Sequence, residues 1–335
     1  MEELEGKAFG LPLTDGARVL VLLGGFPDDH AHWQHQIGAF EGDYHILSIA
    51  TPDFDRLRLR RKWGYEPAEV VTLIRACIDK HLCSGGDSGG GGGGGGGSRP
   101  DRSFDLCAHD WGAYWGYLLV AQLNAPKDPT TLSVRKLVTL DVGAGARSTP
   151  RAVPAADLAA AAVAAAGKSS GSGGGGKKAV RAQHPGQKGF LWTLPYQLTF
   201  ATIFLVGTLL SEALADLLLR FFMHVLWPLL GPLGRDALIV RPLEEVQWWM
   251  CWPYYQLWFN HIFRLRAPPL PQFPSCPTLF IWGERKRAFF HTGKFVAKLQ
   301  STQGCDAKSY DASHWVHWEK AEQVNSDMRS FLLSD

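Results

Sequence analysis

The chain has 335 residues, of which 46% are hydrophobic and 20% are charged. This length suffices for one large α/β domain with an insertion or for two small domains, and the hydrophobic content suffices for a sizeable core. The net charge is only +2, and no stripe of basic and aromatic residues is present, so we expect no nucleic-acid partner.

Cysteine usage and the N-terminal residues predict the cellular compartment. None of the six cysteines forms a Cys-x-x-Cys pair, so free thiols are expected. The first 16 residues are acidic and lack the apolar segment of a signal peptide. Together these features indicate a protein of the cytoplasm.

Predicted strands and helices alternate along much of the chain. Apolar runs indicate buried strands, and apolar residues at helical spacing indicate helices. The strands are expected at 19–23, 44–49, 104–107, 136–140, 278–282 and, more weakly, 308–310, and the helices at 66–82, 113–124 and 321–333. This alternation predicts an α/β fold with a mostly parallel sheet that is covered by helices on both faces.

Two low-complexity segments interrupt this pattern. Residues 84–98 are nearly all glycine, and residues 155–178 are an alanine-rich tract followed by serine and glycine. Such segments cannot bury enough apolar surface to order themselves, so both are predicted to be surface insertions without a chemical role.

The alternation stops between the two halves of the predicted sheet. Helical, aromatic-rich sequence fills 191–230 and 243–263. The expected organisation is a first core part at 1–149, a helical lid at 150–274 and a second core part at 275–335. The sequence does not predict an oligomeric state.

One lid segment raises the question of membrane contact. Residues 189–211 contain no charged side chain and reach the roughly 20 residues that a bilayer span requires. Pro195, Tyr196, Gln197 and several threonines dilute the segment, and an amphipathic continuation follows it. We therefore expect a buried lid helix, or one that touches a membrane surface, in preference to a true span.

The most informative stretch is Ala108-His109-Asp110-Trp111-Gly112, which lies between a predicted strand and a predicted helix. A strand, a sharp turn and a helix, with small residues two positions before and after the central residue, are typical of a nucleophile elbow. An aspartate at the centre can attack an sp3 carbon to form an alkyl ester. The alternative is a plain helix cap, since aspartate is common there.

Three motifs together resemble a known family. They are Gly24-Gly25-Phe26-Pro27, His109-Asp110-Trp111-Gly112 and Ser313-His314-Trp315, the last followed by Glu319 and a final helix. Their order is similar to that of the α/β-hydrolase superfamily, and within it to the epoxide hydrolase and haloalkane dehalogenase branch. The resemblance covers nearly the whole chain outside the two low-complexity segments.

The resemblance implies a role for each motif. Asp110 would be the nucleophile, and the main-chain amides of Phe26 and Trp111 would form the oxyanion hole. Members of the family typically carry a histidine where this chain has Gly24, so the loop that holds Phe26 is expected to be less firmly ordered.

The same resemblance makes His314 the general base that activates water. His317 is the competing candidate. The acid that orients His314 is less clear, because the loop after Gly283 lacks the aspartate that most relatives carry there. Asp141, at the end of a predicted strand, and Glu284 are the two candidates, and Asp141 is preferred.

The lid is expected to select between two reactions. Relatives that open epoxides use lid tyrosines to protonate the departing oxygen. Tyr196 and Tyr255 are the candidates here, with Tyr254 as the substitute, although aromatic residues in helices more often form core or pocket wall. Halide displacement instead needs two N–H donors around the leaving halide. Phe26 occupies the position that often supplies the second donor in relatives, so epoxide opening is favoured over halide displacement.

The sequence predicts neither a metal ion nor a cofactor. No phosphate-binding glycine motif is present. His30, His32 and His35 superficially resemble metal ligands, but positions 30 and 32 do not share a helix face.

The expected activity is hydrolysis of a lipophilic epoxide to a vicinal diol, with water as the second substrate. Two alternatives stay open: a haloalkane dehalogenase, and a catalytically impaired binding protein on the same fold. The atypical Gly24 and the missing aspartate after Gly283 favour the second alternative.

Overall fold

The computed structural model describes the following residues: 4–14, 16–55, 61–84, 102–124, 132–146, 189–230, 240–263 and 271–334. Within them, seven strands form one sheet in the order β1-β3-β2-β4-β5-β6-β7. The strands are β1 (Gly6–Gly10), β2 (Val19–Leu23), β3 (His45–Ile49), β4 (Arg102–His109), β5 (Leu132–Leu140), β6 (Thr278–Gly283) and β7 (Asp306–Tyr310).

Neighbouring strands are parallel except at one edge, where β1 runs antiparallel to β3. All residues of β2, β3 and β6 are buried, as expected for parallel strands that are covered on both faces. The α/β class and the mostly parallel sheet predicted from the sequence are therefore confirmed. The edge strand β1 was not predicted, because its sequence has no apolar run.

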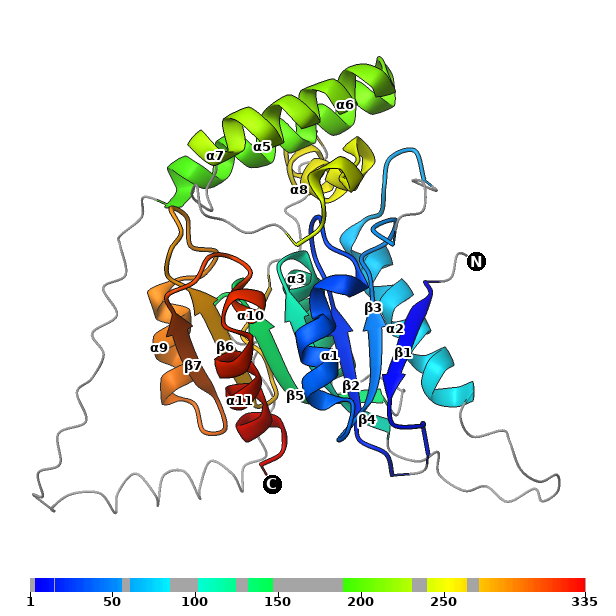
Figure 1. Cartoon of the computed structure of the whole chain (residues 1–335), viewed down its shortest axis with the longest axis vertical. Helices are drawn as coiled ribbons and strands as arrows, with labels where there is room; N and C mark the ends of the chain where they lie inside the picture. The colour runs from blue at the N-terminus through cyan, green and yellow to red at the C-terminus, as the bar shows by residue number, and fades with distance from the viewer. Residues whose placement is uncertain are drawn as a thin grey trace, which may run out of the picture.

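Helices cover both faces of the sheet (Figure 1). On one face lie η1 (His30–Trp33), α1 (Gln34–Phe40), α10 (Val316–Glu319) and α11 (Ala321–Leu332). On the other lie α2 (Pro67–Ser84), α3 (Trp111–Leu123) and α9 (Gly293–Ser301). Each face thus has its own hydrophobic core, and the strands separate the two.

The lid helices lie above the carboxyl ends of the parallel strands (Figure 1). They are α5 (Gly189–Leu209), α6 (Glu212–Phe221), η2 (Phe222–Leu226), α7 (Trp227–Leu230), η3 (Leu243–Glu245), η4 (Trp248–Cys251) and α8 (Trp252–Phe263). The helical sequence over 191–230 is divided among several helices. A break occurs at Ser211, whose hydroxyl accepts a hydrogen bond from the Leu214 amide at 3.3 Å and caps α6.

Helix α5 includes most of the apolar segment that raised the question of a membrane span. Among the helices described, none has the length and apolar character needed to cross a bilayer. The two low-complexity segments fall almost entirely outside the described residues, as do parts of the predicted domain boundaries. The division into 1–149, 150–274 and 275–335 stays a prediction.

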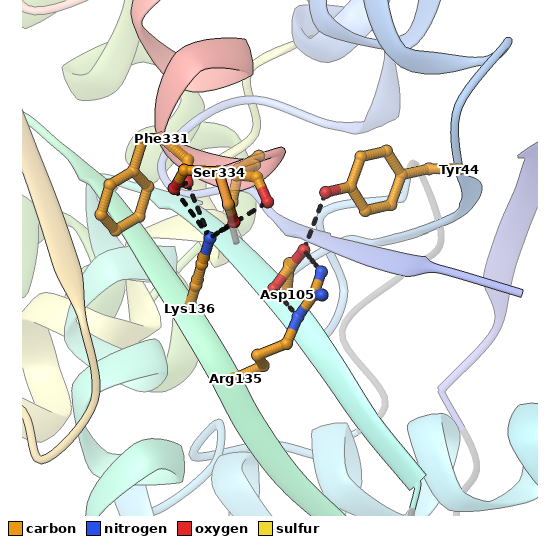
Figure 2. A network of polar contacts seen from close by, with 7 residues as sticks. Tyr44, Asp105, Arg135, Lys136, Phe331 and Ser334 are labelled. Atoms are coloured by element: carbon orange, nitrogen blue, oxygen red, sulfur yellow. Dashed lines mark hydrogen bonds and ion pairs between the residues drawn. The ribbon is translucent and has the colours of Figure 1, made fainter. Parts of the chain in front are cut away.

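A polar network joins β4 and β5 to neighbouring parts of the core (Figure 2). Asp105 of β4 is fully buried, and its carboxylate accepts hydrogen bonds from the Tyr44 hydroxyl at 2.9 Å and from Arg135 Nε at 3.0 Å. Lys136, on the same strand as Arg135, donates to the Phe331 carbonyl at 3.0 Å at the end of α11. These bonds neutralise a buried charge and tie the last helix to the sheet.

Candidate active site

The turn between β4 and α3 holds Asp110 in a strained conformation. Its backbone angles are φ 54° and ψ −125°, in a region that residues other than glycine rarely occupy. The side chain makes no capping hydrogen bond to α3, so helix capping does not explain this aspartate. A Cβ atom on Gly112 would lie 2.2 Å from the Leu23 carbonyl oxygen, so the turn requires glycine there. This geometry is that of a nucleophile elbow.

His314 lies opposite Asp110, in the loop between β7 and α10. Its Nε2 atom is 3.7 Å from Asp110 Oδ2, and its Nδ1 atom is hydrogen-bonded to Asp141 Oδ2. The imidazole is buried. The three side chains, predicted separately from the sequence, therefore form one line of aspartate, histidine and aspartate.

Asp141 is placed at the end of β5, also with positive φ, at 69°. Its carboxylate is fully buried and accepts a hydrogen bond from the Gly283 amide at 3.0 Å. Glu284, the other candidate acid, is exposed and bonds to the Ser309 hydroxyl at 2.5 Å instead of His314. Of the two candidates, the structure brings only Asp141 to the histidine.

Lys286 is a site residue that the sequence did not predict. Its side chain is completely buried, and its Nζ atom donates to Asp141 Oδ1. Each carboxylate oxygen of Asp141 is therefore bonded to a different side chain, Oδ1 to Lys286 and Oδ2 to His314. Lys286 lies in a run of four charged residues, 284–287, and such runs are usually solvated, so no local signal marks it.

The charges at the site shift the pKa values of its members. Burial of the His314 ring disfavours its charged form, but the carboxylates of Asp141 and Asp110 outweigh this effect and raise the pKa of His314 to about 9. Burial also disfavours the Asp141 carboxylate, yet Lys286 and His314 lower the pKa of Asp141 to about 2. At neutral pH the pair is thus an imidazolium and a carboxylate.

The loop at Gly24 to Pro27 approaches the elbow closely. A Cβ atom on Gly25 would lie 2.5 Å from the Trp111 amide nitrogen, so only glycine allows this approach. A Cβ atom on Gly24 would lie 2.5 Å from Cε1 of His32. The space that a histidine at position 24 would occupy is thus already filled by the His32 ring. Gly25, the residue directly before Phe26, thus lies against the backbone of Trp111.

Two adjoining cavities, one of about 20 Å³ and one of about 150 Å³, lie over Asp110 beneath the lid. Tyr196 of α5 and Tyr254 of α8 line both of them. The remaining walls are largely apolar and aromatic: Phe26, Met223, Trp227, Phe290 and Trp315 at the smaller cavity, and Trp111, Tyr114, Val142, Leu257 and Phe290 at the larger.

Both cavity tyrosines hold their protons strongly. Burial raises the pKa of Tyr196, and the nearby charge of Asp110 acts in the same direction. Burial raises the pKa of Tyr254 well above its usual range, and a hydrogen bond from the Trp111 side chain opposes this only in part. Both hydroxyls are therefore neutral donors at physiological pH.

The structure does not bring Tyr255 to the site, contrary to the sequence interpretation. It lines neither cavity, and its ring packs against those of Phe204, with centroids 5.1 Å apart, and Phe259, at 5.0 Å. Its neighbour Tyr254 takes the position expected for it. Sequence spacing could not separate the two candidates, because consecutive residues of α8 point in directions about 100° apart and the rotation of this helix is not encoded locally.

Comparisons with known proteins agree with this architecture. No family sequence model and no curated protein matches the chain. A solved structure of a variant epoxide hydrolase from Bacillus megaterium matches 99% of this chain and 97% of its own, with a TM-score of 0.61 and 18% identity. The epoxide hydrolase VrEH1 from Vigna radiata matches 98% of each chain, with a TM-score of 0.54 and 17% identity.

Other enzymes share the same architecture. An enol-lactonase from Burkholderia xenovorans LB400 matches 99% of this chain and 96% of its own, with a TM-score of 0.50 and 14% identity. These likenesses confirm the fold that the sequence motifs suggested. At such identities they do not carry a substrate or a mechanism from one protein to another.

Proposed function

Starting from the α/β-hydrolase fold that this chain has, we propose that it opens epoxides to vicinal diols through an ester on Asp110. In the first step an Asp110 carboxylate oxygen attacks an epoxide carbon, and the bond between that carbon and the ring oxygen breaks. Tyr196 or Tyr254 donates a proton to the departing oxygen. The product of this step is a hydroxyalkyl ester of Asp110.

In the second step His314 removes a proton from water, and the resulting hydroxide attacks the carbonyl carbon of the ester. The amides of Phe26 and Trp111 stabilise the oxyanion. Collapse of this intermediate breaks the ester bond between the carbonyl carbon and the alkyl oxygen and releases the diol. The proton on His314 returns to the tyrosine through solvent, so one epoxide and one water give one diol.

Formation of the ester also prepares the base. The carboxylate of Asp110 holds a proton on His314 in the resting protein. When Asp110 becomes a neutral ester, that attraction is lost and the pKa of His314 falls. The histidine is then able to accept a proton from water only after the first step is complete.

A single observation carries the proposal. The strained Asp110 lines a cavity together with His314, itself bonded to Asp141, and two tyrosines whose hydroxyls are neutral. Ester hydrolysis by a serine nucleophile does not require a proton donor at the position of these tyrosines, whereas opening of an epoxide ring does. The apolar cavity walls favour a lipophilic substrate.

The two alternatives are less well supported. Halide displacement needs free N–H donors near the leaving group, but the Trp111 side chain is engaged with Tyr254, and Phe26 offers no side-chain donor. A pure binding protein leaves the strain at Asp110 unexplained. The ion pair between Lys286 and Asp141 does favour slow turnover, because Asp141, the acid that orients His314, is also paired with Lys286.

The proposal is tested with a panel of lipophilic epoxides and matched alkyl chlorides. We expect diol formation from the epoxides, no chloride release, and loss of activity in Asp110→Asn. Chloride release that exceeds diol formation would favour the dehalogenase. Diol formation that persists unchanged in Asp110→Asn would contradict the ester route.

A further inference from the structure

Three buried histidines meet on the face of the sheet opposite the α3 side, and the proposed reaction uses none of them. His32 lies in η1, His109 is the last residue of β4, and His317 lies in α10. No more than 1% of any of the three residues is exposed. One ring nitrogen from each lies within 4.8 Å of those of the other two. The group is called the histidine cluster below.

Main-chain carbonyls fix the tautomers of two members. His32 Nδ1 is bonded to the Asp29 carbonyl oxygen, which can only accept, so Nδ1 carries the proton and Nε2 has a lone pair. His109 Nε2 likewise donates to the His314 carbonyl at 3.1 Å, which leaves a lone pair on Nδ1. Both free nitrogens lack a hydrogen-bond partner among the described residues.

His317 has no partner at either ring nitrogen within the described part of the chain. Burial lowers the pKa values of all three histidines, those of His109 and His317 well below the usual range, so the rings are neutral. The cluster therefore offers three lone pairs and one N–H. That N–H can satisfy at most one of the other lone pairs, and unsatisfied buried acceptors are costly.

We propose that the histidine cluster binds one Zn²⁺ ion through His32 Nε2, His109 Nδ1 and a ring nitrogen of His317. Neutral imidazoles are good ligands for this ion, and ligating histidines usually donate their other N–H to a carbonyl or carboxylate, as His32 and His109 do. No fourth residue of ligating type belongs to the cluster in the described residues, so water takes the fourth position.

The required rearrangement is small. Tetrahedral coordination at the usual Zn–N length places the nitrogens about 3.4 Å apart, against at most 4.8 Å here. His32 and His109 are held by their carbonyl partners. The ring of His317 packs against neighbouring rings, but no hydrogen bond among the described residues fixes its rotation, so rotation of this ring would close the site.

Of the three histidines that superficially resemble metal ligands in the sequence, His30, His32 and His35, only His32 belongs to the cluster. His30 is instead bonded through Nδ1 to the Ser48 hydroxyl at 2.9 Å, and the ring of His35 packs on Trp318 with centroids 4.6 Å apart. Neither belongs to the cluster. His35 is therefore a matched control, because it is a histidine of the same segment with no expected role in binding.

The ion would join three segments of the proposed site. His32 follows the loop of Phe26, His109 precedes Asp110, and His317 follows His314. Bound Zn²⁺ is therefore expected to stabilise the folded state, since a ligand that binds only that state raises the melting temperature. This inference stands independently of the proposed reaction.

The test uses full-length protein without an affinity tag, stripped with a chelator and dialysed. Titration with Zn²⁺, followed by calorimetry and by metal analysis after gel filtration, should give one ion per chain and a higher melting temperature. Co²⁺ should give the visible absorption of tetrahedral coordination. If the stripped wild-type protein takes up no Zn²⁺ above background in this titration, the proposal is overturned.

Two variants locate the site. His317→Gln and His32→Gln should each weaken Zn²⁺ binding by at least about 100-fold, since loss of a partner behind a ligand already costs about 10- to 100-fold. His35→Gln should bind as the wild type does. Circular dichroism of the stripped proteins shows whether each variant is folded. With two variants, the test stays valid when one of them misfolds. Unchanged stoichiometry and affinity in a folded cluster variant would overturn the assignment.

Discussion

At the scale of single residues, the proposed chemistry depends on the charges that surround His314. One ring nitrogen faces Asp110 and the other faces Asp141, and Asp141 in turn is paired with Lys286. Two carboxylates and two cations thus lie in one row beneath the lid, and all of them except Asp110 are buried. Removal of any one charge changes the protonation of the others.

Hydrolysis of the ester should therefore depend on pH. The resting His314 has a raised pKa of about 9, which falls once Asp110 is esterified. The unprotonated base accumulates as pH increases, so the rate of ester hydrolysis should rise with pH and level off below pH 9. Rapid-quench mass spectrometry of the ester measures this rate. A rate that falls between pH 6 and 8 would contradict the role of His314 as base.

Asp141→Asn should slow the second step far more than the first. The substitution removes the charge that orients His314, and the equivalent loss in a serine protease triad costs about 10⁴-fold in kcat. Asp110 should still be alkylated, so the ester accumulates. Glu284→Gln is the matched control and should leave both steps nearly unchanged. Equal effects of the two substitutions would show that Asp141 has no special role.

At the scale of elements, the rotation of α8 decides which hydroxyl reaches the cavity. Tyr254 lines it, and Tyr255 packs away from it. Tyr254→Phe and Tyr196→Phe should each slow epoxide opening, by about 10²-fold or more if one tyrosine is the main proton donor. Tyr255→Phe should keep near-normal activity. Single-turnover alkylation measures the step directly, and a larger loss in Tyr255→Phe would contradict the placement.

At the scale of the whole molecule, much of the architecture could be predicted from the sequence. Apolar runs located the buried strands, and the order of the three motifs indicated the fold. Asp110, His314 and Asp141 could be proposed because each follows a predicted strand or matches a motif. Parallel strands bring such positions to one edge of the sheet.

The remaining features depend on contacts that local sequence does not encode. Lys286 is buried in an ion pair with Asp141, a residue of a distant strand end, and its position in a run of charged residues gives no sign of this. The histidine cluster joins residues of three distant segments whose spacing carries no pattern. The choice between Tyr254 and Tyr255 depends on the rotation of α8 about its axis, which tertiary packing determines.

The most direct test of the account is a single turnover of an epoxide in water enriched in ¹⁸O, followed by mass spectrometry of the peptide that contains Asp110. Water attacks the carbonyl carbon of the ester, so heavy oxygen should enter the Asp110 carboxylate, and the first diol released should carry only light oxygen. Heavy oxygen in the diol and none in the peptide would show direct attack of water on the epoxide and would contradict the ester mechanism.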